Sequence, residues 1–254
     1  MMKRVLKIVG LILLVPLLGL VALAVVMFVG NPEIPDGREL EGFVRVVKDS
    51  FVSLDVLDAG NGTVALIDSG NDPEGKILLA ELKRRGLGPD AVKAIFITHG
   101  HVDHISGCHL FPKAEVMALE ADVAIAEGKA KPGSPIGRLM PVADRQVHVT
   151  RVLKDGETIQ VGNLSVRVFS IPGHSQGSAA YLVNGILFLG DSADGTKDGK
   201  LVAAKWPVTE DPAQNRASLK ALAARLKPEE VKQLVFSHTG VLSGFAPLQA
   251  FAAE

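Results

Sequence analysis

The sequence predicts an α/β protein preceded by one apolar N-terminal helix. Short runs rich in Val, Ile, Leu and Phe, bounded by Gly, Pro and Asn, indicate strands. Segments in which apolar residues recur every three or four positions indicate helices, and the two kinds of segment are interspersed along the chain. The chain has 254 residues, 47% of them hydrophobic, which suffices for one globular core after the N-terminal segment.

An N-terminal membrane segment is predicted at residues 1–30. Three basic residues lie within the first seven positions, and the run from Ile8 to Gly30 carries no charge. Such a run is long enough to cross a bilayer as a helix, with its basic end on the cytoplasmic side. An uncleaved anchor is preferred to a cleaved signal peptide with its site at Ala22-Leu23-Ala24, because the apolar run continues beyond that site. The rest of the chain is therefore expected on the extracytoplasmic (periplasmic or extracellular) side, anchored to the membrane or, after cleavage, secreted.

Local patterns then predict the elements in order. Residues 31–40, which contain two prolines, are expected to be a linker, and residues 41–254 to form one domain. Its strands are expected at 43–47, 51–57, 63–67, 94–98, 114–118, 157–161, 164–171, 179–183, 186–189 and 234–236. Asn-Gly pairs at 61–62 and 184–185 predict tight hairpins. Helices are expected directly after residue 70, at 119–126 and at 211–226, and long loops at 128–141 and 195–206.

Composition excludes several classes of function. The formal net charge is −1, without the basic excess that nucleic-acid binding requires. The single cysteine, Cys108, rules out an internal disulfide and a zinc site built from several thiolates. For Cys108 a small buried apolar role is preferred to a reactive or metal-adjacent thiol. For Trp206, in the second long loop, a packing role is preferred to a substrate contact.

The segment Thr98–Gly107 carries the strongest chemical signal. His99 and His101 are two residues apart, so on extended backbone they project to the same side. Asp103 and His104 join them if the chain turns sharply. Three imidazoles and a carboxylate within six residues favour a divalent-cation site over a polar loop that is rich in histidine by chance.

Three further donors lie at, or directly after, predicted strand ends: His174, Asp191 and His238. Strand ends can meet along one rim of a sheet, so these residues can converge on the histidine segment. Seven donors exceed what one tetrahedral ion accepts, which predicts two metal ions. One division gives His99, His101 and His174 to one ion and Asp103, His104 and His238 to the other, with Asp191 between them.

The order His-x-His-x-Asp-His, Pro-Gly-His, Gly-Asp and a late His resembles the metallo-β-lactamase-fold metallohydrolase superfamily, from about residue 40 to the end. The resemblance implies a four-layer αβ/βα sandwich of two mixed sheets flanked by helices. It also implies that Asp68, which matches an early aspartate of the family, supports the metal site without binding the metal. Asp191 resembles the bridging aspartate of the glyoxalase II-like and lactonase-like branch and is typically absent from true β-lactamases. Glyoxalase II itself carries a glutathione-binding C-terminal region, for which too few residues follow His238.

The leading hypothesis is a dinuclear metal-dependent hydrolase of a small-molecule ester, thioester or lactone, acting through a metal-bridging hydroxide. Zinc is the first expectation for both ions, with iron or manganese as alternatives, and Asp103 and Asp191 are the expected catalytic carboxylates. Two other functions remain open: a mono-iron sulfur dioxygenase-type enzyme, and a metal-holding or binding module without catalysis.

Overall fold

The computed structural model of the protein describes residues 18–254 except 20, 22, 28 and 140–146. It divides the chain into two units, Met1–Asn31 and Pro32–Glu254. Most of the predicted membrane segment lies outside the described residues. Among those that are described, no helix has both the length and the apolar character needed to cross a bilayer.

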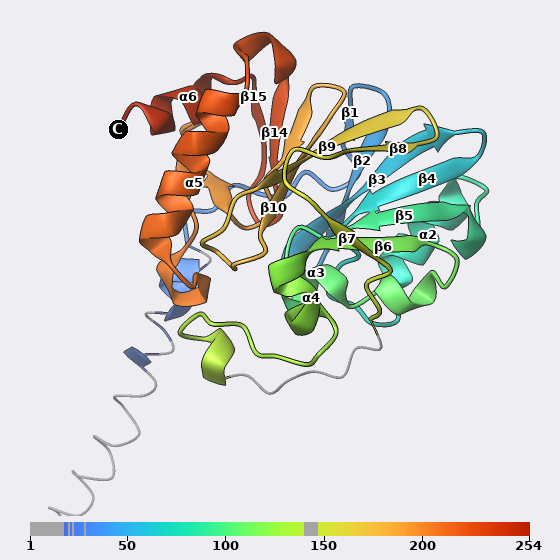
Figure 1. Cartoon of the computed structure of the whole chain (residues 1–254), viewed down its shortest axis with the longest axis horizontal. Coiled ribbons are helices and arrows are strands. Elements are labelled where there is room, and N and C mark those ends of the chain that lie inside the picture. Colours follow the sequence, from blue (N-terminus) through green and yellow to red (C-terminus); the bar gives the residue numbers. More distant parts are fainter. Residues whose placement is uncertain (1–17, 20, 22, 28, 140–146) are drawn as a thin grey trace, which may run out of the picture. The chain divides into compact units, whose positions relative to one another are not determined.

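The first sheet contains seven strands in chain order (Figure 1). Its strands are β1 (Glu39–Leu40), β2 (Val44–Asp49), β3 (Val52–Gly60), β4 (Thr63–Ile67), β5 (Val92–Phe96), β6 (Glu115–Leu119) and β7 (Arg151–Leu153). Neighbours are antiparallel from β1 to β4 and parallel from β4 to β7. In the β3–β4 turn Asn61 and Gly62 both have positive φ, as the predicted Asn-Gly hairpin requires.

The second sheet contains six strands in the order β15-β14-β11-β10-β9-β8. Its strands are β8 (Thr158–Val161), β9 (Leu164–Ser170), β10 (Ala179–Val183), β11 (Ile186–Phe188), β14 (Gln233–Phe236) and β15 (Gly240–Ser243). Only the β11–β14 pair is parallel, so this sheet is mixed as well. A small separate sheet pairs β12 (Ala193–Gly195) with β13 (Leu201–Ala203).

Three apolar clusters fix the layers. The first lies between the two sheets and includes Phe96 and Tyr181, whose hydroxyl donates to the carbonyl of Ile97. The second joins the outer face of the seven-stranded sheet to its helices, and the third joins the six-stranded sheet to its own helices. The helices of the first sheet are α2 (Lys76–Arg84), α3 (Val102–Ile105) and α4 (Glu120–Ala126), and those of the second are α5 (Pro212–Arg225) and α6 (Ala246–Ala252). The α/β class with two mixed sheets is thus confirmed.

Several short elements correct the sequence prediction. The expected loop at 195–206 contains strand β13, the expected linker at 31–40 ends in strand β1, and both β15 and α6 follow His238. The expected loop at 128–141 contains a 3₁₀ turn at Gly137–Leu139, and its last two residues lie outside the described residues. Strands of two to four residues are too short to show an alternating pattern in the sequence, so pairing with neighbouring strands determines where they form.

Candidate metal centre

All seven predicted donors lie at one end of the two sheets. His99 comes three residues after β5, His101 precedes the single turn α3, and Asp103 and His104 lie within that turn. The other three follow β9, β11 and β14 of the second sheet: His174, Asp191 and His238. Their ligand atoms form three overlapping groups, each within 4.8 Å: His99, His101 and His174; His99, His104 and Asp191; Asp103, His104 and His238.

The first cluster consists of the imidazoles of His99, His101 and His174. The Nε2 atom of His174 lies 3.1 Å from Nε2 of His99 and 3.2 Å from Nδ1 of His101. The second cluster consists of Asp103, His104 and His238. In it an Asp103 oxygen lies 3.5 Å from Nε2 of His238 and 3.7 Å from Nε2 of His104.

Asp191 lies between the two clusters. Its carboxylate approaches Nε2 of His238 at 3.0 Å, Nε2 of His104 at 3.4 Å and Nε2 of His174 at 3.8 Å. It thus approaches one imidazole of the first cluster and two of the second, whereas the ion pairs of Asp103 within the described part of the chain are with His104 and His238. Asp191 therefore lies within 4 Å of imidazoles of both clusters, and its bridging of two ions stays a prediction.

Hydrogen bonds around the centre orient the histidines. His104 donates from Nδ1 to Asp68 over 2.8 Å, and His238 donates from Nδ1 to the carbonyl of Phe51 over 2.8 Å. The hydroxyl of Thr98 donates its proton to Asp68 and has none left for His99, whose Nδ1 lies 3.1 Å away. In this second hydrogen bond Thr98 is therefore the acceptor and Nδ1 of His99 the donor.

His174 is oriented in the same way, since Thr209 donates its hydroxyl to the carbonyl of Lys205 and lies 3.4 Å from Nδ1 of His174. In their neutral form, four of the five imidazoles consequently turn an unprotonated Nε2 toward the centre.

This arrangement suits cations and is poorly satisfied without them. With the proton of each ring on Nδ1, the Nε2 lone pairs of His99 and His174 face each other at 3.1 Å. Among the described residues five buried side-chain polar atoms lack a hydrogen-bond partner, and three belong to the centre: Nε2 of His101, Nε2 of His104 and Oδ1 of Asp191. Buried donors of this kind are stabilised by a bound metal ion. The residues present therefore fit two divalent ions.

The electrostatics of the two clusters differ. Burial holds the pKa values of His99 and His174 well below the ordinary value, so the first cluster offers neutral imidazoles. Burial also opposes charge on His238, but the Asp191 carboxylate outweighs it and raises the pKa of His238 to about 9. The carboxylates of Asp103 and Asp191 thus make the second cluster negative. They attract a metal cation or, in its place, protons on the neighbouring imidazoles.

Asp68 lies next to the centre, and its support of a metal site stays a prediction. It is buried and accepts hydrogen bonds from His104 and from both the backbone N–H and the hydroxyl of Thr98. Sequence reasoning missed the roles of Thr98, Thr209 and the Phe51 carbonyl. Thr98 could have been found from the sequence, because it directly precedes His99. Thr209 and Phe51 could not, because only the tertiary fold brings them to the centre.

Cys108 is inert in this structure. It is buried in the apolar cluster on the helical side of the first sheet, with Sγ 3.3 Å from the hydroxyl of Ser69, and burial raises the pKa of its thiol to about 12. Because alkylation requires the thiolate, we expect the folded protein to resist iodoacetamide at pH 8 and the urea-unfolded protein to react fully. Mass spectrometry of both samples measures this, and rapid labelling of the folded protein would contradict the buried role.

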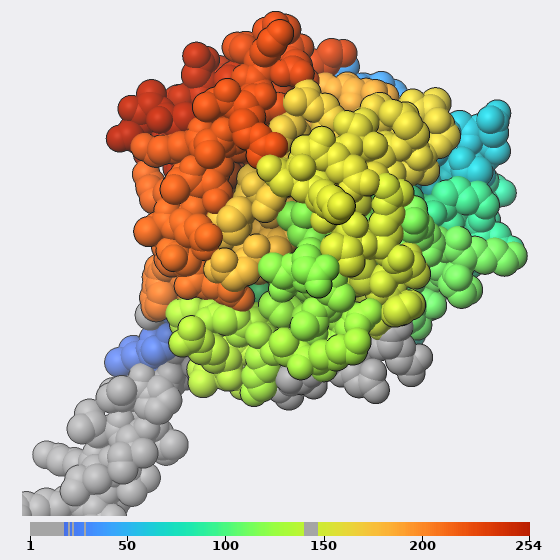
Figure 2. All heavy atoms as spheres, in the orientation of Figure 1, coloured from blue at the N-terminus to red at the C-terminus, as the bar shows by residue number. Residues whose placement is uncertain are grey.

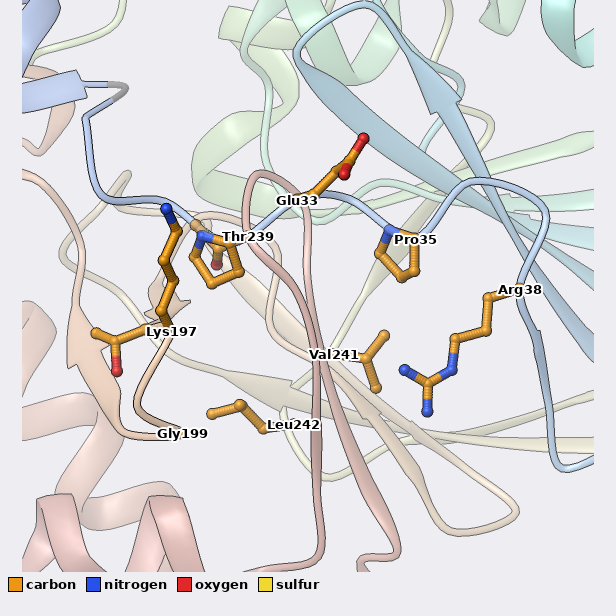
Figure 3. Close-up of a pocket in the computed structure, with 10 residues that line it drawn as sticks. Glu33, Pro35, Arg38, Lys197, Gly199, Thr239, Val241 and Leu242 are labelled. Atoms are coloured by element: carbon orange, nitrogen blue, oxygen red, sulfur yellow. The ribbon is translucent and has the colours of Figure 1, made fainter.

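A pocket of about 380 Å³ lies away from the seven donors. Figure 3 shows Glu33, Arg38, Lys197 and Thr239 among the residues that line it. Although Thr239 follows His238 in the sequence, the pocket contains none of the donors. The chemistry therefore belongs to the histidine clusters.

Comparison with known proteins identifies the family. The model of the family described as "Metallo-beta-lactamase superfamily" matches residues 56–238. The hydroxyacylglutathione hydrolase of Chelativorans sp. (strain BNC1) is 32% identical over 160 residues, which cover 59% of this chain and 51% of that protein. The one from Fuscovulum blasticum is 30% identical over 188 residues, covering 73% of this chain and 62% of that protein. The chain thus spans between half and two thirds of the length of these relatives.

Solved structures show the same fold at lower identity. A metallo-beta-lactamase family protein from Thermus thermophilus has a TM-score of 0.59 and 23% identity, covering 83% of this chain and 78% of its own. The subclass B3 metallo-beta-lactamase BJP-1 of Bradyrhizobium japonicum has a TM-score of 0.62 and 22% identity, with coverages of 82% and 79%. Together with the family match and the convergence of the seven donors, these similarities show that the chain belongs to the metallo-beta-lactamase superfamily.

Proposed function

We propose that this protein is a dinuclear metal-dependent hydrolase of a small ester, thioester or lactone. The observation that carries the proposal is the position of Asp191, whose carboxylate lies between two histidine clusters from different sheets. The relatives named hydroxyacylglutathione hydrolase support this choice, because an acylglutathione is a thioester. The donor set of imidazoles and carboxylates is suited to zinc, with iron or manganese as alternatives.

Each residue has a definite role in this mechanism. One ion would be held by His99, His101 and His174. The other would be held by Asp103, His104 and His238, and Asp191 would bind both. Two such ions supply a water that is activated near neutral pH and polarise the carbonyl of the substrate. The chain itself keeps the imidazoles in one tautomer, through Asp68, Thr98, Thr209 and the Phe51 carbonyl, so that no reorientation is needed during the reaction.

The test combines metal analysis with a substrate panel. We expect two equivalents of divalent metal per chain, and chelator-sensitive hydrolysis of at least one class among aryl esters, lactones and acylglutathione thioesters. One iron per chain, with oxygen consumed in the presence of a persulfide, would replace the proposal by the dioxygenase alternative. If the protein binds stoichiometric metal but hydrolyses no class of substrate in the panel, the remaining interpretation is a metal-holding module without catalysis.

Trp206 is the residue that we propose for substrate contact. It is 62% exposed, which contradicts the packing role preferred from the sequence. Its carbonyl accepts from the N–H of Thr209, whose hydroxyl lies 3.4 Å from Nδ1 of His174, so the backbone of Trp206 is one hydrogen bond away from a residue that contacts the first cluster. The neighbouring segment that contains Gly137–Leu139 is tied to it by the bond from the N–H of Ile136 to the carbonyl of Pro207. The yellow-green stretch of the chain to which this segment belongs lies at the surface in Figure 2.

We expect Trp206→Ala to raise KM about fivefold for substrates with an apolar acyl group. An indole that covers part of the substrate contributes on the order of 1 kcal/mol to binding. The value of kcat and the melting temperature should change little, because the exposed ring packs on little else. Steady-state kinetics measures this, with the exposed Ile77 of α2 changed to Ala as control. An unchanged KM would remove Trp206 from the substrate site.

We also propose that residues 1–30 anchor the domain on the extracytoplasmic side of a membrane. The support is the uncharged run from Ile8 to Gly30 behind a basic start. In fractionated cells the full chain should appear in the membrane fraction, and protease added from the extracytoplasmic side should digest the domain. Recovery in the cytoplasmic fraction would contradict this placement.

A further inference from the structure

Asp122 is a fully buried carboxylate that joins the two loops of the first cluster. It lies in the first turn of α4, with none of its surface exposed. One oxygen accepts from the N–H of Gly100 over 2.6 Å and from the hydroxyl of Ser175 over 2.7 Å. The other oxygen accepts from the N–H of Gly177 over 2.8 Å.

These donors lie beside the metal-binding histidines. Gly100 is between His99 and His101, and Ser175 directly follows His174. Asp122 therefore connects all three residues of the first cluster through one side chain, although the two loops are more than 70 residues apart in the sequence. A hydrogen bond to a carboxylate is stronger than one between neutral groups, so three of them define the distance between the loops.

The backbones of Gly100 and Gly177 approach α4 so closely that no side chain fits between them. A Cβ atom on Gly100 would lie 2.8 Å from the backbone nitrogen of Ala126, and one on Gly177 would lie 2.5 Å from that of Asp122. Both glycines thus permit a backbone approach that no other residue type allows. The loops are held against α4 at the positions that the Asp122 carboxylate can reach.

The charge of Asp122 also has a consequence. Its three donors are neutral, and no ion pair to Asp122 is recorded in the part of the chain that the structure describes. A buried carboxylate without a cationic partner is costly, whereas a divalent ion at the first cluster, whose three imidazoles carry no charge of their own, would compensate it.

We propose that Asp122 is the positioning residue of the first cluster and determines its affinity for a divalent ion, as Asp68 supports the second. This inference rests on the proposed two-ion site. Removing such support weakens metal binding by about 10- to 100-fold. The effect should fall on the ion held by His99, His101 and His174, while the other ion remains bound.

The test is a competition titration of the full chain with Zn²⁺ against a chromophoric chelator. For Asp122→Asn we expect one ion at the wild-type affinity and one weakened about 10- to 100-fold, with the melting temperature of the metal-free protein nearly unchanged. Glu120→Gln, an exposed residue in the same turn of α4, makes the same charge change and should keep both affinities. In an Asp103→Ala background, where only the first cluster is complete, Asp122→Asn should weaken the remaining ion.

Two results would overturn the inference: wild-type affinity for both ions in Asp122→Asn, or equal weakening of both together with a lower melting temperature of the metal-free protein. If Asp122→Asn does not fold, Ser175→Ala removes one of the three hydrogen bonds and should weaken the same ion by a smaller factor. A wild-type chain that binds one ion would refute the two-ion proposal itself. The effect of Asp122→Asn on that one ion would then still decide the role of Asp122.

Discussion

Asp191→Ala should lower kcat/KM by about a thousandfold or more while the fold persists. The Asp191 carboxylate approaches histidines of both clusters, at 3.8 Å from His174 in the first and 3.0 Å from His238 in the second. Its removal would take one ligand from each ion of the proposed pair. The loss of transition-state stabilisation should reach about 4 kcal/mol, since each tenfold in rate corresponds to about 1.4 kcal/mol.

The measurement is steady-state hydrolysis together with metal content and circular dichroism. Asp90→Ala is the matched control, because it removes an exposed carboxylate whose ion pair is with Lys113 and should leave turnover unchanged. Wild-type turnover in Asp191→Ala with two ions still bound would refute the central place of this residue. A loss of secondary structure would instead show that Asp191 acts through folding.

Gly173→Ala should damage both the stability of the domain and its candidate metal centre. Gly173 has φ +136°, and a Cβ there would lie 2.2 Å from the backbone nitrogen of Asn215 in α5 and 2.4 Å from its Cα. Asn215 in turn donates to the carbonyl of Ser192, next to Asp191. The added methyl must therefore displace either the His174 loop or the start of α5, and both movements disturb the centre.

We expect a loss of stability of about 3 kcal/mol, from overpacking and backbone strain together, and a loss of activity of at least about a hundredfold. Urea unfolding and hydrolysis assays measure the two effects. Gly88→Ala is the control, because nothing lies within 4 Å of its Cβ position and its φ of −110° suits any residue. A stable and active Gly173→Ala protein would mean that the Pro172–Ser175 loop does not constrain His174.

The long elements and the donors could be predicted from the sequence because their signals are local. Strand β4 was predicted at its observed bounds, and the Asn-Gly turns have the positive φ values that their residue types favour. The seven donors were found because imidazole and carboxylate are conspicuous at strand ends. The residues that orient the donors were harder to predict. Thr209 and the Phe51 carbonyl contribute a hydroxyl and a backbone carbonyl, which are polar groups that any loop contains. The Phe51 carbonyl meets His238 only through the packing of the two sheets, and Thr209 meets His174 only through the packing of two loops that are 35 residues apart in the sequence.

The donors span residues 99 to 238 and come from both sheets, which sets an order of assembly. Neither sheet alone offers a complete pair of binding sites, since His174, Asp191 and His238 arrive with the second. Full metal loading consequently reports that the late strand β14 has docked. A chain whose second sheet has not yet formed would lack three of the seven donors, so uptake of both proposed ions would follow folding of the whole domain.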